Sequence, residues 1–194
     1  MRKVVAVELV SLDGIVGSPE EWAFSYSNDE MEEVNAAGMA ASDAMLLGRV
    51  TYEGLAAFWP NQPGGTPLVD YINSVRKHVV SRTLEDPLEW NNSTLLESDV
   101  AEGVAELKEQ PGKDITVIGS ADLVRSLLED GLLDELRLMV HPIVLGGGKH
   151  LFEEGDRKSL ELVGSRAFAT GVLYLSYRPA DEQGARGESP HERR

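Results

Sequence analysis

Three short segments of the chain place glycine, hydroxyl and guanidinium groups where an apolar, strand-like run gives way to a loop or a helix. They are residues 46–52, 79–83 and 117–123. At such junctions, the free backbone amides of a helix start and the side chains of Ser, Thr and Arg can bind phosphate oxygens. Because the three segments are spread along one chain, they predict several anchor points for one ligand. A dinucleotide cofactor, which is long and carries several phosphates, fits this pattern.

Each segment also has a plain structural interpretation. The first can be an ordinary helix start with a solvated Arg49, the second the polar end of a strand, and the third a tight turn. The third is the strongest phosphate-binding candidate, because a strand, Gly119, a small residue and an amphipathic helix follow one another in the right order. From the segments alone, both interpretations remain open.

No other short motif indicates nucleotide or metal chemistry. A Gly-x-Gly-x-x-Gly fingerprint is missing after the first apolar run. The glycine run at 146–148 is not a P-loop, because Ile143 stands where its first glycine belongs and His150 where Ser or Thr belongs. A turn between two strands explains that run equally well. The histidines lack metal-ligand spacing, so no metal site is predicted. They are His78, His141, His150 and His191.

Asp29 is the acid of greatest chemical interest. It falls in the first turn of a helix that a capping-box pattern predicts. The helix macrodipole alone would favour a carboxylate there, and Asp13 is most simply a turn residue. Before that helix, Trp22 and Phe24 in residues 15–26 either plug the core or line a pocket for a flat ring.

A sheet and its helices must position these residues, and the apolar patterns predict both. Runs rich in β-branched residues predict strands, and helical spacing of apolar residues predicts helices. The predicted strands are residues 4–10, 44–47, 77–81, 115–118, 136–140, 160–163 and 172–177. The predicted helices include residues 49–58, 68–75, 99–109 and 121–129, and one that begins near Asp29. Residues 15–26 are predicted to be a long irregular loop.

Strands that alternate with helices, followed by a run of strands, predict an α/β fold. We expect one twisted, mixed and mostly parallel sheet of about eight strands, flanked by helices and closed by a C-terminal antiparallel hairpin. Residues 1–178 are predicted to form a single domain. Residues 179–194 are polar and without an apolar period, which predicts a disordered tail.

The bulk composition limits the class of protein. With 194 residues, of which 42% are hydrophobic and 26% charged, the chain suits one globular core. The net charge of -15 argues against general binding to nucleic acid or to an anionic membrane. The chain has no cysteine, which excludes disulfides and thiolate chemistry, and no apolar run long enough to span a membrane. The cytoplasm is the simplest expected location.

Taken in order, these segments resemble the dihydrofolate reductase-like superfamily, and most closely the reductase domain of the bifunctional deaminase–reductase of riboflavin biosynthesis and its stand-alone relatives. The matching stretches are residues 11–14, 47–53, 80–82, 117–120 and 132–146. The resemblance covers residues 1 to about 178. It implies a single dihydrofolate reductase-like domain with NADPH lying across the strand ends.

The resemblance also implies roles for residues at matching positions of this sequence. Gly48, Arg49 and Thr51 match a pyrophosphate-binding helix start, and Ser81 and Arg82 match the strand end that grips the adenosine 2′-phosphate. Gly119, Ser120, Ala121 and Asp122 match a second phosphate-binding turn, and Ala6 matches a backbone contact to the nicotinamide. Asp29 matches the helix that carries the substrate-binding carboxylate of dihydrofolate reductase.

The resulting hypothesis is an NADPH-dependent reductase that acts on a C=N or C=O bond of a small heterocyclic or sugar-phosphate substrate, as 5-amino-6-(5-phosphoribosylamino)uracil reductase does. Asp29 is the candidate proton donor, and Trp22 and Phe24 are candidate walls of the substrate pocket. The alternatives are a non-catalytic NADP(H)-binding protein and a pterin or dihydrofolate reductase. Apolar residues in the C-terminal strands, together with the resemblance, predict a homodimer.

Overall fold

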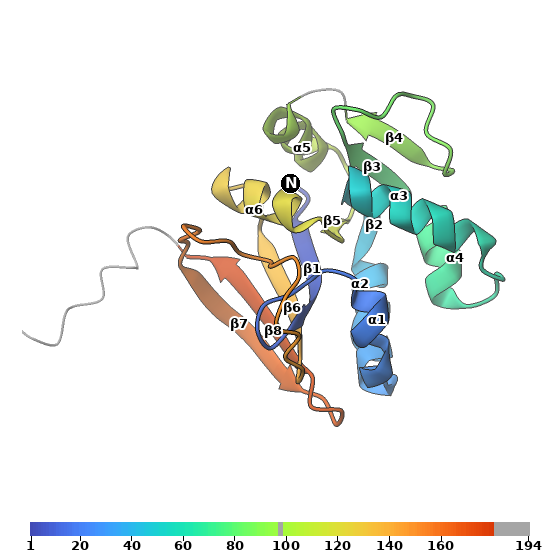
Figure 1. Cartoon of the computed structure of the whole chain (residues 1–194). Helices are drawn as coiled ribbons and strands as arrows, with labels where there is room; N and C mark the ends of the chain where they lie inside the picture. Colours follow the sequence, from blue (N-terminus) through green and yellow to red (C-terminus); the bar gives the residue numbers. More distant parts are fainter. Residues whose placement is uncertain (97–98, 181–194) are drawn as a thin grey trace, which may run out of the picture.

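A computed structural model describes residues 1–96 and 99–180 of the chain. Its centre is one eight-stranded sheet with the strand order β4-β3-β2-β5-β1-β6-β8-β7 (Figure 1). Strands β1 to β6 are parallel wherever they pair, whereas β8 pairs antiparallel with both β6 and β7. The predicted α/β class, the mostly parallel sheet and the closing antiparallel hairpin are therefore confirmed.

Strands and helices alternate from β1 to β6. The strands are β1 (Val4–Ser11), β2 (Ser42–Gly48), β3 (Arg76–Val80), β4 (Ser93–Leu96), β5 (Asp114–Val117), β6 (Glu135–His141), β7 (Leu160–Ala167) and β8 (Leu173–Pro179). The α-helices are α1 (Pro19–Trp22), α2 (Asp29–Ala41), α3 (Arg49–Phe58), α4 (Pro67–Ser74), α5 (Val100–Glu109) and α6 (Ala121–Glu129), with short 3₁₀ turns η1 (Phe24–Tyr26) and η2 (Trp59–Asn61). Helices α3 and α6 begin and end at the predicted residues.

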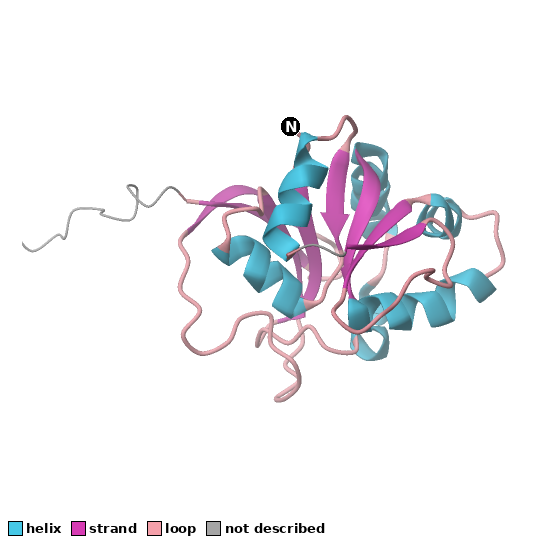
Figure 2. Cartoon of the chain, turned by 90° about the horizontal axis from the view of Figure 1, so that it is seen from above, coloured by secondary structure: helices cyan, strands magenta, loops and turns pink. Residues whose placement is uncertain are grey.

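The sheet buries apolar side chains on both of its faces, because successive residues of a strand point to opposite sides. On one face, Leu46 of β2 and Val117 of β5 pack with residues of α5 and α6. On the opposite face, Met45 packs with residues of α3 and α4, and Met139 of β6 packs with residues of α2. Figure 2 shows the helices on the two sides of the sheet.

Three features differ from the sequence predictions. Strand β4 was not predicted, because its four residues are at most partly buried and give no clear apolar pattern. Residues 15–26 are not wholly irregular: they contain α1, which has Pro19 at its first position, and η1. Strand β8 extends to Pro179, and the Ala180 amide donates to the Ser159 carbonyl oxygen at 2.9 Å, so the sheet passes the predicted domain limit at residue 178.

The remainder of the predicted tail, residues 181–194, lies outside the described residues. Among the helices of residues 1–96 and 99–180, none has the length and apolar character that a membrane crossing requires.

Candidate cofactor and active site

Two of the predicted phosphate-binding segments meet at the carboxyl ends of neighbouring parallel strands. Strand β2 ends at Gly48, and its partner β5 ends at Val117, two residues before Gly119. The Gly48 amide donates to the Gly119 carbonyl oxygen at 3.3 Å. A Cβ atom on Gly48 would lie 2.8 Å from Ser120 Oγ, closer than side chains normally approach. A glycine at position 48 thus allows the two turns to come together.

Both turns lead into helices whose first amides have no side-chain cap. Helix α3 follows Gly48 and α6 follows Ser120, and neither residue gives a side-chain hydrogen bond to its helix. Helix α5, by contrast, is capped by Asp99, whose carboxylate accepts from the Ala101 amide at 3.0 Å. First-turn amides carry partial positive charge and bind anions. The starts of α3 and α6 therefore offer amide donors to phosphate groups.

A cavity of about 260 Å³ opens beside these two helix starts. Gly48, Arg49, Ser120 and Asp122 contribute to its wall, together with the apolar side chains of Val80 and Val100. Four of the residues predicted to bind cofactor thus share one cavity. Its mixed wall of amides, charged groups and aliphatic side chains suits part of a nucleotide.

Thr51, Ser81 and Arg82 lie close to parts of this cavity. A Cβ atom on Gly119 would lie 3.1 Å from Thr51 Oγ1, so the hydroxyl of α3 packs against the second turn. Ser81 and Arg82 follow Val80 of the cavity wall directly. Ser81 Oγ accepts from the two backbone amides of the turn after β3, at 3.1 and 3.0 Å, and Arg82 is exposed.

Ala6 and Ala121 are buried in regular elements. Ala6 lies in β1 between Val117 of β5 and Leu136 of β6, and Ala121 begins α6. Any contact of these two residues with a cofactor would involve backbone atoms or the small methyl group.

The charged side chains at the cavity are paired. Arg49 Nη1 lies 2.9 Å from Glu53 Oε2, one turn further along α3. The Asp122 carboxylate pairs with Arg125 of α6 and with Lys149, which comes from the loop after β6. Pairing with two cations reduces the repulsion that Asp122 would exert on a phosphate.

Glu8 is a buried acid at this site that the sequence interpretation missed. It lies on β1, is 7% exposed, and its Oε1 accepts from the Gly119 amide at 3.0 Å. Burial raises the pKa of Glu8 to about 7, although the hydrogen bond from Gly119 acts in the opposite direction. The available signal was a lone carboxylate in an otherwise apolar strand, between Val7 and Leu9.

Asp13 fixes the glycine-rich loop that follows β6. Its carboxylate accepts from Ser11 Oγ at 2.6 Å, from the Gly146 amide at 2.8 Å and from the Leu145 amide at 3.1 Å. The hydrogen bond from Ser11, followed by those from the Gly146 and Leu145 amides, lowers the pKa of Asp13 to about 2. Asp13 is thus more than the predicted turn residue, because it joins the turn after β1 to the loop after β6.

The aromatic segment before α2 packs on His141 at the end of β6. Trp22 is 7% exposed, and its ring meets the buried His141 ring edge-on, with centroids 5.2 Å apart. Phe24 is 61% exposed. Asp29 is exposed in the first turn of α2, where the sequence predicts it. The structure thus places Trp22 in the core and leaves Phe24 and Asp29 open to solvent.

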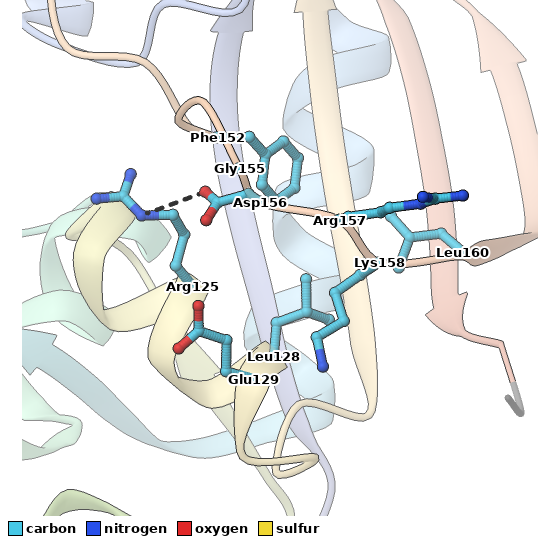
Figure 3. Close-up of a pocket in the computed structure, with 9 residues that line it drawn as sticks. All are labelled: Arg125, Leu128, Glu129, Phe152, Gly155, Asp156, Arg157, Lys158 and Leu160. Carbon is cyan, nitrogen blue, oxygen red and sulfur yellow. Dashed lines mark ion pairs between the residues drawn. The ribbon is translucent and has the colours of Figure 1, made fainter.

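A second and larger cavity, of about 440 Å³, lies beside the later turns of α6 (Figure 3). Arg125, Leu128 and Glu129 of α6 line it opposite residues 152–160, and Arg125 Nε lies 3.6 Å from Asp156 Oδ2. Arg125 also pairs with Asp122 and Glu153, so its charge is already compensated. None of the residues predicted to bind cofactor or substrate lines this cavity.

Comparison with known proteins identifies relatives of the chain. The model of the RibD C-terminal domain matches residues 2–174. The uncharacterized protein YyaP of Bacillus subtilis (strain 168) is 32% identical over 181 residues, which cover 91% of this chain and 94% of YyaP.

Several solved structures share the fold. A protein of Shewanella sp. PV-4 named for riboflavin biosynthesis has a TM-score of 0.75 and 22% identity, with 92% of this chain and 99% of that chain covered. Dihydrofolate reductase from Enterococcus faecalis, solved with NADP(H), has a TM-score of 0.63 and 16% identity, and the match covers 92% of this chain and 97% of the reductase. A third structure is the diaminohydroxyphosphoribosylaminopyrimidine deaminase/5-amino-6-(5-phosphoribosylamino)uracil reductase of Thermotoga maritima. It has a TM-score of 0.63 and 15% identity, and the match covers 92% of this chain and 57% of the Thermotoga maritima chain. The predicted dihydrofolate reductase-like fold is thereby confirmed, and the chain belongs to the RibD C-terminal domain family.

Proposed function

We propose that this protein is an NADPH-dependent reductase that transfers a hydride to a C=N or C=O bond of a small heterocyclic or sugar-phosphate substrate. The observation that carries the proposal is the cavity where Gly48, Arg49 and Ser120 meet at two helix starts without side-chain caps. Family membership supports it, as do the reductases among the proteins that share the fold, one of them solved with NADP(H).

The chemistry of the cavity fits a phosphorylated dinucleotide. Amides at the starts of α3 and α6 would bind pyrophosphate oxygens. Arg49 would leave its ion pair with Glu53 and bind a phosphate instead. The exposed Arg82, with Ser81 beside it, would bind the 2′-phosphate that distinguishes NADPH from NADH. When bound, the nicotinamide supplies the hydride.

The protein's own residues would position the substrate and deliver a proton. Reduction of C=N or C=O consumes a proton as well as a hydride, and we propose Asp29 as its source. Asp29 is exposed in the first turn of α2, directly after the aromatic segment of residues 22–26. The exposed Phe24, just before that helix, is the proposed contact to a flat substrate ring, whereas Trp22 packs in the core against His141.

Cofactor titration tests the proposal directly. NADPH and NADH are titrated into the purified protein, and the tighter ligand is then used with a panel of imines, carbonyl compounds and dihydropterins. Steady oxidation of NADPH by an imine or a carbonyl compound is the expected result. Binding without turnover across the panel would favour a non-catalytic NADP(H)-binding protein, and turnover of dihydropterins alone would favour a pterin reductase. Failure of both dinucleotides to bind would overturn the proposal.

Arg82 provides the test of cofactor choice. Arg82→Ala should weaken NADPH binding by about 10- to 100-fold, because a charge-assisted hydrogen bond to phosphate is worth roughly 1.5–3 kcal/mol. Binding of NADH, which has no 2′-phosphate, should stay nearly unchanged. Arg157→Ala, at the second cavity, is the matched control and should affect neither dinucleotide. Equal weakening of both cofactors by Arg82→Ala would show that Arg82 does not read the 2′-phosphate.

A further inference from the structure

Glu8 contacts the turn that forms the proposed pyrophosphate site. Its Oε1 accepts from the Gly119 amide at 3.0 Å. A Cβ atom on Gly119 would lie 3.9 Å from this oxygen and 3.1 Å from Thr51 Oγ1. The turn is therefore held between a carboxyl group from β1 and a hydroxyl group from α3. Because the Gly119 backbone has a φ of +65°, which side chains rarely tolerate, a glycine fits best between them.

The described residues around Glu8 carry no charge that would compensate a buried carboxylate. On β6 its sheet partner is Leu138, after β5 it meets Gly119, and on α3 the nearby group is the Thr51 hydroxyl. The charged residues at the starts of α3 and α6 are engaged elsewhere. Arg49 pairs with Glu53, and Asp122 pairs with Arg125 and Lys149.

The register of the sheet explains why an acid is buried at this point. Strand β5 pairs with β1 only as far as Ala6 and Val117, whereas β6 pairs with β1 through to Ser11. Beyond Ala6, β1 is no longer paired with β5, and the turn that follows β5, which contains Gly119, lies beside it. The Glu8 side chain leaves β1 on the same face of the sheet as Ala6 and accepts from the Gly119 amide of this turn.

We propose that Glu8 is a positioning residue for the cofactor, and that the dinucleotide binds to the form of the protein in which Glu8 is a neutral carboxylic acid. The inference rests on the proposed function. An ionised carboxylate is the stronger acceptor, so it would compete with the pyrophosphate for the Gly119 amide, and its charge would repel the phosphates. A neutral acid adds no charge, and its O–H group can donate to an oxygen atom.

This coupling makes cofactor binding depend on pH. Burial raises the pKa of Glu8 to about 7, so the free protein loses this proton near neutral pH. Above that pH, binding must take up one proton, and the Kd for NADPH should rise by up to about tenfold per pH unit. Below that pH, Glu8 is already neutral, and its contribution to the pH dependence disappears.

Glu8→Gln separates this effect from every other titrating group, including the cofactor phosphates. Glutamine keeps an oxygen that accepts from the Gly119 amide but carries no charge. NADPH binding is measured by fluorescence between pH 6 and pH 9 for the wild type, Glu8→Gln and the control Glu129→Gln at the far end of α6. We expect the wild type and the control to lose about tenfold or more affinity relative to Glu8→Gln by the alkaline end. Parallel profiles for all three proteins would overturn the inference.

A second measurement needs no variant. The Glu8 carboxyl carbon is followed by NMR through a pH titration of the wild type, with and without saturating NADPH. By linkage, the pKa of Glu8 should rise by about one pH unit or more when NADPH is bound. An unchanged or lower pKa would overturn the inference even if Glu8→Gln failed to fold. A wild type that binds neither NADPH nor NADH at any pH would overturn the proposed function itself.

Discussion

Asp29 carries the proposed proton transfer, and a single isosteric change tests it. Asp29→Asn removes the acid while keeping the side chain's size at the start of α2. We expect turnover to fall by at least about 100-fold, the lower end of what a positioned acid–base group contributes. The Kd for NADPH should stay unchanged, because Asp29 lines neither of the two cavities. Turnover is measured with the best substrate of the panel.

The matched control for Asp29 is Glu32→Gln, an exposed acid one turn further along α2. It removes the same charge from the same helix and should leave turnover near the wild-type value. If Asp29→Asn turned over as fast as the wild type, water or another side chain would have to supply the proton.

Lys77 is a fully buried cation whose effect on stability depends on pH. It lies in β3, where its Nζ donates to the carbonyl oxygens of Val75 at 2.9 Å and Asn91 at 3.2 Å and lies 4.2 Å from the centroid of the Trp90 ring. Burial lowers the pKa of Lys77 from 10.5 to about 8. Between these two values the unfolded chain binds more protons than the folded chain, so the free energy of unfolding should rise with pH across this window.

Lys77→Met tests this slope by removing the titrating group. Urea unfolding at pH 7.5, 9 and 10.5 should show the wild type gaining stability relative to Lys77→Met, by on the order of 3 kcal/mol at most. Lys158→Met, at the second cavity, is the control and should follow the wild type. A constant difference between wild type and Lys77→Met at all three pH values would contradict the prediction.

At the scale of elements, Asp13 should control the order of the loop after β6. Asp13→Ala removes the acceptor for the Leu145 and Gly146 amides, so both amides should exchange with solvent faster, as measured by hydrogen exchange. Asp13→Asn keeps one oxygen acceptor and should give intermediate rates. The depressed pKa of Asp13 means that the carboxylate holds the loop above about pH 4 and releases it as the pH falls through about 2. Unchanged exchange in Asp13→Ala would show that other contacts order this loop.

Elements with a strong local pattern were predictable from the sequence. Helix α6 has buried residues at helical spacing, and a glycine with positive φ, Gly131, lies just after its end, so its bounds could be predicted without tertiary information. Strand β4 could not be predicted, since it has four residues and, within residues 1–96 and 99–180, pairs with β3 alone. Its conformation depends on a neighbouring strand edge, and such a dependence leaves no local pattern.

The site shows the same limit of sequence reasoning. Glycine and hydroxyl residues at strand ends identify the turns at Gly48 and Ser120, because backbone conformation restricts the residue type there. The same reasoning could not identify Glu8, because its contact with Gly119 depends on where β5 stops pairing with β1. Register between strands that are distant in the sequence is set by the whole sheet, so it could be recognised only in the structure.

At the scale of the whole molecule, the net charge of -15 creates a field that opposes an anionic cofactor. Affinity for the proposed cofactor would then have to come from local groups: the amides that begin α3 and α6, Arg49 and Arg82. In such a field, one further buried negative charge next to the proposed pyrophosphate site would be unfavourable, in line with the proposed role of Glu8 protonation. The predicted cytoplasmic location stays a prediction.

The predicted homodimer would form at the edge of the sheet where β7 lies. Within residues 1–96 and 99–180, no strand pairs with the outer edge of β7. Leu162 and Val163 of β7 and Leu173 of β8 are 52%, 60% and 43% exposed. An unpaired edge with exposed apolar side chains can pair with another chain, and such patches often mark interaction surfaces. We therefore expect light scattering at micromolar concentration to give twice the chain mass of 21.2 kDa.

Val163→Glu should shift this protein toward the monomer, because a second copy would have to bury the added carboxylate without a partner. Val144→Glu is the control, because Val144 is 66% exposed but belongs to the loop after β6 and not to β7. It should leave the mass unchanged. A wild-type monomer at micromolar concentration would refute the dimer outright. A dimer that Val163→Glu leaves intact would place the interface on another face of the molecule.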